Sequence, residues 1–182
     1  MTNKNPKAVE RLNIIISKGR AHISDEIEEA RKKTGFVIID TEGSATELNS
    51  RIAAESDLVI VPMADEQQDA EDAVGTISEI RSIARLYKKT IPTRVLFSRT
   101  KAAVKSRLAK SLNLDMRGQF EHLAAELKER TAYSNLHNAG GGLDDLDMED
   151  VSGVDKARKN AKLVIDEIIS ILEKISHEVE HA

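Results

Sequence analysis

Four short runs of branched aliphatic residues punctuate the chain, and each is continuous rather than alternating with polar residues. Such a run is typical of a strand that is buried on both faces of a sheet. Amphipathic stretches separate the runs, and this alternation of strand and helix predicts a parallel sheet with helices on both faces. The four predicted strands span residues 12–16, 36–40, 58–62 and 94–98.

Apolar residues at helical spacing predict the helices between and after these strands. The clearest pattern spans residues 67–87, where Ala73, Ile77 and Ile80 share one stripe. A shorter helix is expected over residues 23–33. Beyond residue 98 the pattern becomes helical, and we expect three further helices. They span residues 102–112, 119–129 and 155–175.

The order of these elements predicts one α/β domain over residues 1–182. We expect a flexible N-terminus over residues 1–11 and the strand and helix repeats of the sheet over residues 12–98. A helical C-terminal part should follow over residues 99–182. Three consecutive glycines and a run of carboxylates mark residues 138–150 as an acidic loop within that part.

The composition narrows the class of protein. A chain of 182 residues, 40% of them apolar, is large enough to bury a core as a single domain. It contains no cysteine, which excludes a disulfide framework and a cysteine-ligated zinc or iron site. Its apolar runs are far shorter than the roughly 20 residues that a membrane span needs, and the polar residues 1–7 do not resemble a secretory signal. We therefore expect a cytoplasmic protein.

The charge is unevenly distributed along the chain, although the net charge is only −4. Residues 85–117 contain ten basic residues and a single acidic one, Asp115. Such a cluster suits sequence-independent contact with nucleic-acid phosphates, and a solvated helix face is the alternative. No aromatic residues are interleaved with the charges, so base stacking is not expected. The candidate DNA-binding residues are Arg94, Lys101, Lys105, Arg107 and Lys110.

Residues 36–43 form an apolar run that ends in Asp40 and continues into a turn with Gly43. In P-loop NTPases a carboxylate at such a strand end holds Mg²⁺, because phosphates collect at the carboxyl edge of a parallel sheet. Many α/β proteins end a buried strand in aspartate for capping alone. The pattern by itself leaves both interpretations open.

Further motifs follow in a fixed order after Asp40. An A-x-S-D turn ends at Asp57 and introduces an apolar run that ends in Pro62. The run over residues 94–100 and an R-x-A-Y turn that ends at Tyr133 come later. Over residues 34–176 this order resembles the ParA/MinD-type partition ATPases, with the plasmid-borne ParA-like proteins of rhizobia and agrobacteria as the nearest branch.

The resemblance implies a P-loop NTPase-like parallel sheet, truncated here and flanked by helices, and a role in plasmid or chromosome partition or in DNA transfer. Intact relatives use ATP and Mg²⁺, with the metal on the residue that matches Asp40. The resemblance also implies three partners. They are DNA, a second ParA-like chain in a homodimer or heterodimer, and a centromere-binding protein. The cofactor-binding candidates are Asp40, Thr41, Glu42, Gly43, Ser98 and Arg99.

Two departures from the family pattern limit what the chain is expected to do. The glycine-rich phosphate loop of the family, which contains two lysines, is missing from this sequence. The turn over residues 17–20 has neither the glycine spacing nor the GK[ST] ending of that loop. Ser98 stands where relatives commonly place an asparagine that contacts the base. Without the loop's backbone N–H groups and lysine, we expect a truncated or split form that does not bind ATP alone.

The missing loop also has a structural consequence. In the family, the strand that feeds the loop lies in the middle of the sheet, so its loss leaves backbone groups unpaired. The sheet must then rearrange, borrow a strand or dimerise. An inactive interaction subunit that dimerises with a complete ParA is the alternative role.

Two other patterns have simpler explanations. His177 and His181 complete an H-E-x-x-H sequence, but it lies in the last six residues, where helices fray, and no later residue supplies a third ligand. The carboxylates over residues 65–72 resemble a cation site. They also fall near the N-terminus of the helix expected over residues 67–87, where the helix dipole favours negative charge.

Overall fold

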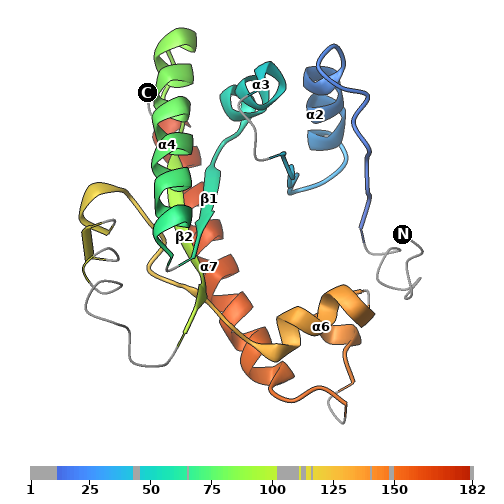
Figure 1. Ribbon diagram of the computed structural model, residues 1–182. Coiled ribbons are helices and arrows are strands. Elements are labelled where there is room, and N and C mark those ends of the chain that lie inside the picture. The colour runs from blue at the N-terminus through green and yellow to red at the C-terminus, as the bar shows by residue number, and fades with distance from the viewer. Residues whose placement is uncertain are drawn as a thin grey trace.

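The computed structural model contains a parallel sheet of three strands in the order β1-β2-β3, with helices packed around it (Figure 1). It describes residues 12–42, 46–64, 66–101, 111, 114–115, 117–139, 141–147 and 150–180. The predicted fold class, α/β with a parallel sheet and a helical C-terminal part, is confirmed.

Strand β1 (Val59–Met63) pairs in parallel with β2 (Thr93–Thr100), from Val59 opposite Thr93 to Met63 opposite Phe97. Strand β3 (Leu127–Lys128) continues the sheet on the other side of β2, also in parallel. Two parallel strands need a long crossover connection, and the helix between β1 and β2 supplies it.

Three of the helices lie close to their predicted places. Helix α4 matches the predicted bounds, α2 matches its prediction to within two residues, and α7 begins one residue before its predicted start and runs five residues beyond its predicted end. None of the helices within the described ranges has a stretch apolar and long enough to cross a membrane. The helices are α2 (Ile23–Arg31), α3 (Glu47–Glu55), α4 (Gln67–Tyr87), α6 (Thr131–Ala139) and α7 (Val154–Glu180), with a 3-10 turn η1 at Leu143–Asp145.

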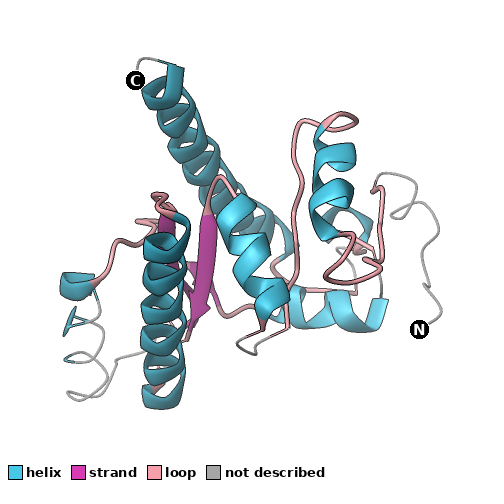
Figure 2. Ribbon diagram, turned by 90° about the horizontal axis from the view of Figure 1, so that it is seen from above, coloured by secondary structure: helices cyan, strands magenta, loops and turns pink. Residues whose placement is uncertain are grey.

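The main core lies between α4 and the sheet. Ala73, Ile77 and Ile80 of α4 pack against Val95 and Phe97 of β2, which are almost completely buried. Helix α4 covers β1 and β2 on one side, and α7 passes on the other (Figures 1 and 2). The spacing of three and four residues along α4 places one apolar stripe on the strands, which is what the sequence pattern predicted.

Two of the four predicted strands are wrong. Residues 12–16 and 36–40 form no strand, and their apolar side chains are largely exposed, with Ile16 at 89% and Ile38 at 94%. Only Ile39 packs inward, against a small cluster that α2 and α3 form. A strand requires a neighbouring strand to share its backbone hydrogen bonds, and no described strand pairs with these runs.

The predicted helix over residues 119–129 is also wrong, because the edge of β2 captures this segment. Val95 N donates to Glu121 O at 2.9 Å, and Leu123 N donates back to Val95 O at 2.9 Å. The segment then enters β3, and Leu123 is fully buried. Sheet pairing thus overrides the local helical pattern. The predicted helix over residues 102–112 and the predicted flexible segment over residues 1–11 lie outside the described residues, apart from residue 111.

Candidate functional site

The carboxyl ends of β1 and β2 lie side by side, and this edge of a parallel sheet is where ligands of open α/β folds bind. Arg99, near the end of β2, forms an ion pair with Asp69 in the first turn of α4, at 2.9 Å. The same carboxylate accepts a hydrogen bond from Ala64 N, one residue beyond β1, at 3.1 Å. Asp69 therefore joins the ends of both strands to the start of α4.

Arg99 is held in an unusual backbone conformation. Its φ is +51°, in the left-handed region that residues other than glycine seldom adopt. Ser98 pairs with Leu127 and Thr100 with Lys128, so Arg99 is the extra residue of a β-bulge. Bulges are frequent beside functional sites because they redirect a side chain. Here the bulge turns the guanidinium towards Asp69, at the edge of the sheet.

Beside the bulge, Glu126 collects three donors. Its carboxylate accepts hydrogen bonds from Thr100 Oγ1 at 2.9 Å, from Lys128 and from Arg117. Burial raises the pKa of Glu126. This increase is outweighed by hydrogen bonds from Lys128 and Thr100 and by the positive charges of Lys128 and Arg117. The pKa of Glu126 therefore lies below its ordinary value. The carboxylate is therefore held ionised within a mostly buried ion-pair network.

Two polar side chains of α7 hold the segment that carries Glu126. Asn160 accepts from Lys128 N at 2.8 Å and donates to Glu126 O at 2.7 Å. Glu167 accepts from Ala124 N and from Ala125 N, both at 2.7 Å. The sheet order ends at β3, so no further described strand bonds these backbone groups. The side chains of α7 bond them instead, and α7 thus takes the place of a neighbouring strand at this edge.

The residues around Asp40 are arranged differently from the prediction. Asp40, Thr41 and Glu42 lie in an irregular exposed segment rather than at a strand end, and Gly43 lies outside the described residues. The carbonyl of Glu42 accepts a hydrogen bond from Asn49 Nδ2 at 2.8 Å, which ties the turn to the first turn of α3. Throughout the described part of the chain, no three His, Asp or Glu side chains gather closely enough to hold a metal ion.

The predicted cofactor-binding residues thus fall into two groups. Ser98 and Arg99 lie at the carboxyl edge of β2, as the prediction placed them, and they neighbour the Asp69 and Glu126 networks. Asp40 to Glu42 instead follow the run that failed to become a strand. The turn over residues 17–20 is closed by its own neighbours, because Lys18 N donates to Glu26 Oε1 at 3.0 Å and Gly19 N to Ser17 Oγ at 3.1 Å.

Four basic residues of the predicted cluster have acidic partners, and one of them is Arg117, which pairs with Glu126. Arg94 pairs with Glu121, and its side chain is only 24% exposed. Lys101 faces Glu129 at a longer distance of 3.9 Å. Arg99 pairs with Asp69, as described above. Lys105, Arg107 and Lys110 of the predicted DNA-binding set lie outside the described residues.

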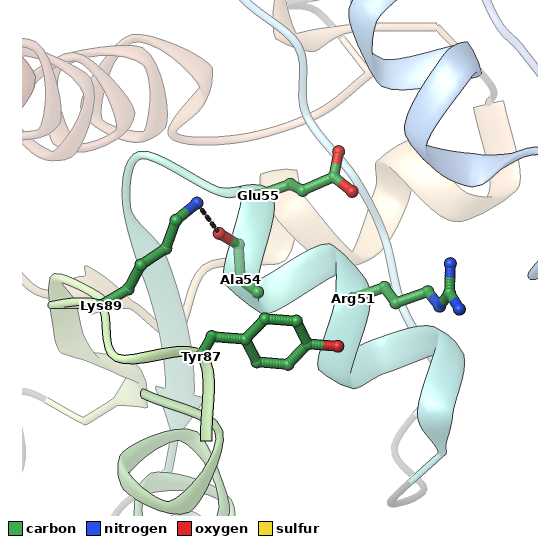
Figure 3. Close-up of a pocket in the computed structure, with 5 residues that line it drawn as sticks. All are labelled: Arg51, Ala54, Glu55, Tyr87 and Lys89. Atoms are coloured by element: carbon green, nitrogen blue, oxygen red, sulfur yellow. Dashed lines mark hydrogen bonds between the residues drawn. The ribbon is translucent and has the colours of Figure 1, made fainter. Parts of the chain in front are cut away.

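A cavity of about 350 Å³ lies at the opposite edge of the sheet, where α3 and α4 lead into β1 and β2. Lys89 Nζ is bound to Ala54 O at 3.2 Å, at the end of α3. The side chains of Arg51 and Glu55 point away from Lys89 and Tyr87 (Figure 3). Because its polar groups diverge, the cavity is not a convergent binding site. Its lining residues are Arg51, Ala54, Glu55, Tyr87 and Lys89.

Sequence reasoning missed the network around Glu126. One signal was present, since Asn160 is a polar residue within the apolar stripe of α7, between the buried Ala157 and Val164. A buried amide at such a position needs hydrogen-bond partners from a neighbouring element. Nothing in the local sequence marks Thr100, Glu126 or Arg117 as members of one site.

Comparison with known proteins assigns the family. The family model described as VirC1 protein matches residues 8–181. Among curated proteins, Protein ParA of Rhizobium radiobacter is 30% identical over 130 residues, which cover 66% of this chain and 59% of the relative. Protein virC1 of Rhizobium rhizogenes is 23% identical over 146 residues, which cover 80% of this chain and 63% of the relative.

The chain therefore spans less than two thirds of the length of these two relatives. The family model nevertheless matches nearly every residue of the chain, including the Asp40 segment and the whole sheet. This chain belongs to the VirC1 protein family and is ParA-like.

Proposed function

We propose that this protein acts in plasmid partition or in DNA transfer, as a ParA-like chain that contacts DNA and does not bind ATP alone. The observation that carries this proposal is the family match over residues 8–181, together with a relative named Protein ParA. The matched regions cover 59% and 63% of these relatives, so a role that is carried over from them to this chain belongs to the proposal.

The DNA contact is assigned to the basic segment over residues 85–117. Arg94, Arg99 and Lys101 are partly compensated by acidic neighbours, which leaves less of their charge for phosphates. The proposal therefore gives the larger share of the contact to Lys105, Arg107 and Lys110. Such contact is independent of sequence, because backbone phosphates carry no sequence information.

Fluorescence anisotropy on a nonspecific duplex at several salt concentrations tests this assignment. The triple variant K105A/R107A/K110A should bind more weakly, and the slope of log K against log salt should fall by about 2 to 3, close to 0.9 per lost phosphate contact. The control variant K32A/K33A/K162A removes the same charge elsewhere, from lysines that pair with acids four residues away in the chain. Equal losses in both variants, or a flat salt dependence of the wild-type chain, would contradict the assignment.

The second part of the proposal concerns nucleotide. Two backbone N–H groups of the lysine and glycine turn are already bonded, one of them to the carboxylate of Glu26, which would repel a phosphate. Isothermal titration with ATP and Mg²⁺ should give no heat in the micromolar range, and Asp40→Ala should change nothing. Micromolar binding that Asp40→Ala abolishes would contradict this part.

A heterodimer with a complete ParA is the second candidate. The outer edge of β1 has no partner strand among the described segments, and the chain spans 59% of the ParA relative. In this role the chain would co-purify with a full-length relative, and nucleotide would bind only in the complex. Failure to co-purify with and without ATP would exclude this candidate while leaving the DNA assignment intact.

A further inference from the structure

The outer edge of β1 offers unused backbone groups. Val59 N donates to Pro92 O at 2.8 Å, so Val59 faces β2 with its backbone polar groups. In a parallel pair alternate residues face opposite sides, so Ile60 and Pro62 direct their backbone away from β2. The sheet order ends at β1, and no described segment pairs there. Because Pro62 has no N–H, Ile60 supplies the donor of this edge.

The same chain carries a strand-like segment without a place in its own sheet. Residues 12–16, here called the arm, run as an extended trace beside α2 (Figure 1). The arm has five residues, as β1 does, and its aliphatic side chains are exposed by 52% to 89%. An exposed apolar segment of this kind is a template for pairing with a free sheet edge. Its aliphatic residues are Leu12, Ile14, Ile15 and Ile16.

The arm is held beside α2 of its own molecule and does not pair with its own β1. It is anchored next to the start of α2, where Ser17 Oγ donates to Glu26 Oε2 at 2.6 Å and Lys18 N donates to Glu26 Oε1. Helix α2 packs on α3, and α3 packs on α4, which covers β1. In the structure the arm therefore lies with α2 (Figure 1), and the edge of β1 stays unpaired among the described segments.

We propose that two copies of this chain exchange their arms, and that the arm of each copy adds a strand to the outer edge of β1 in the other. The exchange is reciprocal, as a two-fold dimer requires, and it uses main-chain hydrogen bonds for affinity. It covers the exposed aliphatic side chains of both arms and gives Ile60 N–H an acceptor. A strand from a different protein is the alternative occupant, and the experiments below separate the two.

Light scattering coupled to size exclusion, on the full chain without nucleotide, Mg²⁺ or DNA, gives the first test. The wild-type chain should have twice the monomer mass of 20.1 kDa at tens of micromolar. The arm variant I14K/I16K should be a monomer. The control variant L86K/L163K changes two other exposed leucines, on α4 and α7, and should stay dimeric. A monomeric wild-type chain, or a dimer that survives I14K/I16K, would overturn the proposal.

A cysteine cross-link provides the second test, since the chain has no native cysteine. Chains with Asn13→Cys, Ile14→Cys or Ile15→Cys are mixed in turn with Ile60→Cys chains and oxidised. Neighbouring strands bring Cα atoms about 4.5 to 5.5 Å apart, which suits a disulfide, so at least one mixture should give a covalent dimer. Leu86→Cys chains mixed with Ile60→Cys chains should not cross-link. A disulfide that forms within one chain of a double variant would place the arm on its own sheet and overturn the exchange.

The donor on the edge supplies a third measurement. Ile60→Pro removes the N–H that points away from β2. Like Pro62, a proline at this position costs β1 no hydrogen bond to β2. The dimer should dissociate at a concentration at least tenfold higher, while thermal unfolding of the monomer changes little. Unchanged dimer affinity would argue against pairing at this edge. None of these measurements uses DNA or nucleotide, so their failure leaves the proposed function standing.

Discussion

Residues 36–40 and β1 are both short apolar runs that lead into or out of α3, yet they have different fates. In β1, Val61 and Met63 are buried and the backbone pairs with β2 along its whole length. In the other run, Ile38 is 94% exposed and only Ile39 packs on α2 and α3. The difference lies in the neighbours rather than in the residues, because a strand gains its hydrogen bonds and burial only beside another strand.

The same contrast extends to the two halves of the molecule. The region from α4 onwards is tied together by the core on Phe97, the Glu126 network and the hydrogen bonds that Asn160 and Glu167 of α7 form. The region over residues 12–42 is held mainly by a small cluster around Ile23, Ile27 and Ile52 and by exposed polar contacts. Stability should therefore be concentrated in the C-terminal region.

The largest expected effect compares two phenylalanines, one from each region. Phe97 is fully buried, and the guanidinium of Arg117 lies 4.0 Å from its ring centroid, whereas Phe36 is 61% exposed. Phe97→Ala should lower the free energy of unfolding by about 3 to 5 kcal/mol, and Phe36→Ala by less than about 1 kcal/mol. Urea denaturation measures both. Similar losses would show that residues 36–40 are packed in solution and would remove the contrast.

The next effect concerns the hydrogen bonds from Asn160 of α7. Asn160→Ala leaves Lys128 N and Glu126 O without their partner, which should cost about 1 to 3 kcal/mol of unfolding free energy. The matched control is Asn135→Ala on α6, where the amide donates to Thr131 O in its own helix. This bond is local and exposed, so the control should stay within about 0.5 kcal/mol of the wild-type chain. Equal effects would mean that α7 does not substitute for a strand.

The smallest effect is the pH dependence of the Glu126 network. The folded-state pKa of Glu126 is lowered, so its stabilising contribution is fully present above the unfolded carboxyl pKa of about 4.3 and is lost as pH falls through the folded value. Glu126→Gln should cost about 1 to 2 kcal/mol at pH 7 and make unfolding less sensitive to acid below about pH 4. Urea midpoints at pH 3 to 7 measure this.

The matched control for this prediction is Glu28→Gln on α2. Its carboxylate forms an ion pair with Lys32 that is exposed to solvent, and such pairs contribute little to stability. The stability of this variant should follow the wild-type curve across the whole pH range. A Glu126→Gln curve parallel to the wild-type curve would indicate that the lysine and arginine around this carboxylate do not act on it.

The part of the fold that follows from local pattern was predictable. The apolar stripes set α4 and α7 and the buried runs set β1 and β2, because amphipathic spacing and continuous apolar residues act through neighbours in the chain. The order of motifs from Asp40 to Tyr133 likewise identified the ParA-like family, which the VirC1 match confirms. The predicted strand over residues 94–98 lies within β2, which places Ser98 and Arg99 near the carboxyl end of that strand.

Only the tertiary structure decided the rest. It determined that residues 36–40 stay unpaired, that residues 121–128 join the edge of β2, and that Glu126 meets Arg117 and Thr100. Each of these outcomes depends on contacts between segments distant in the sequence. A strand needs a neighbour and a buried carboxylate needs donors from other elements, and no local pattern records whether those partners are in place.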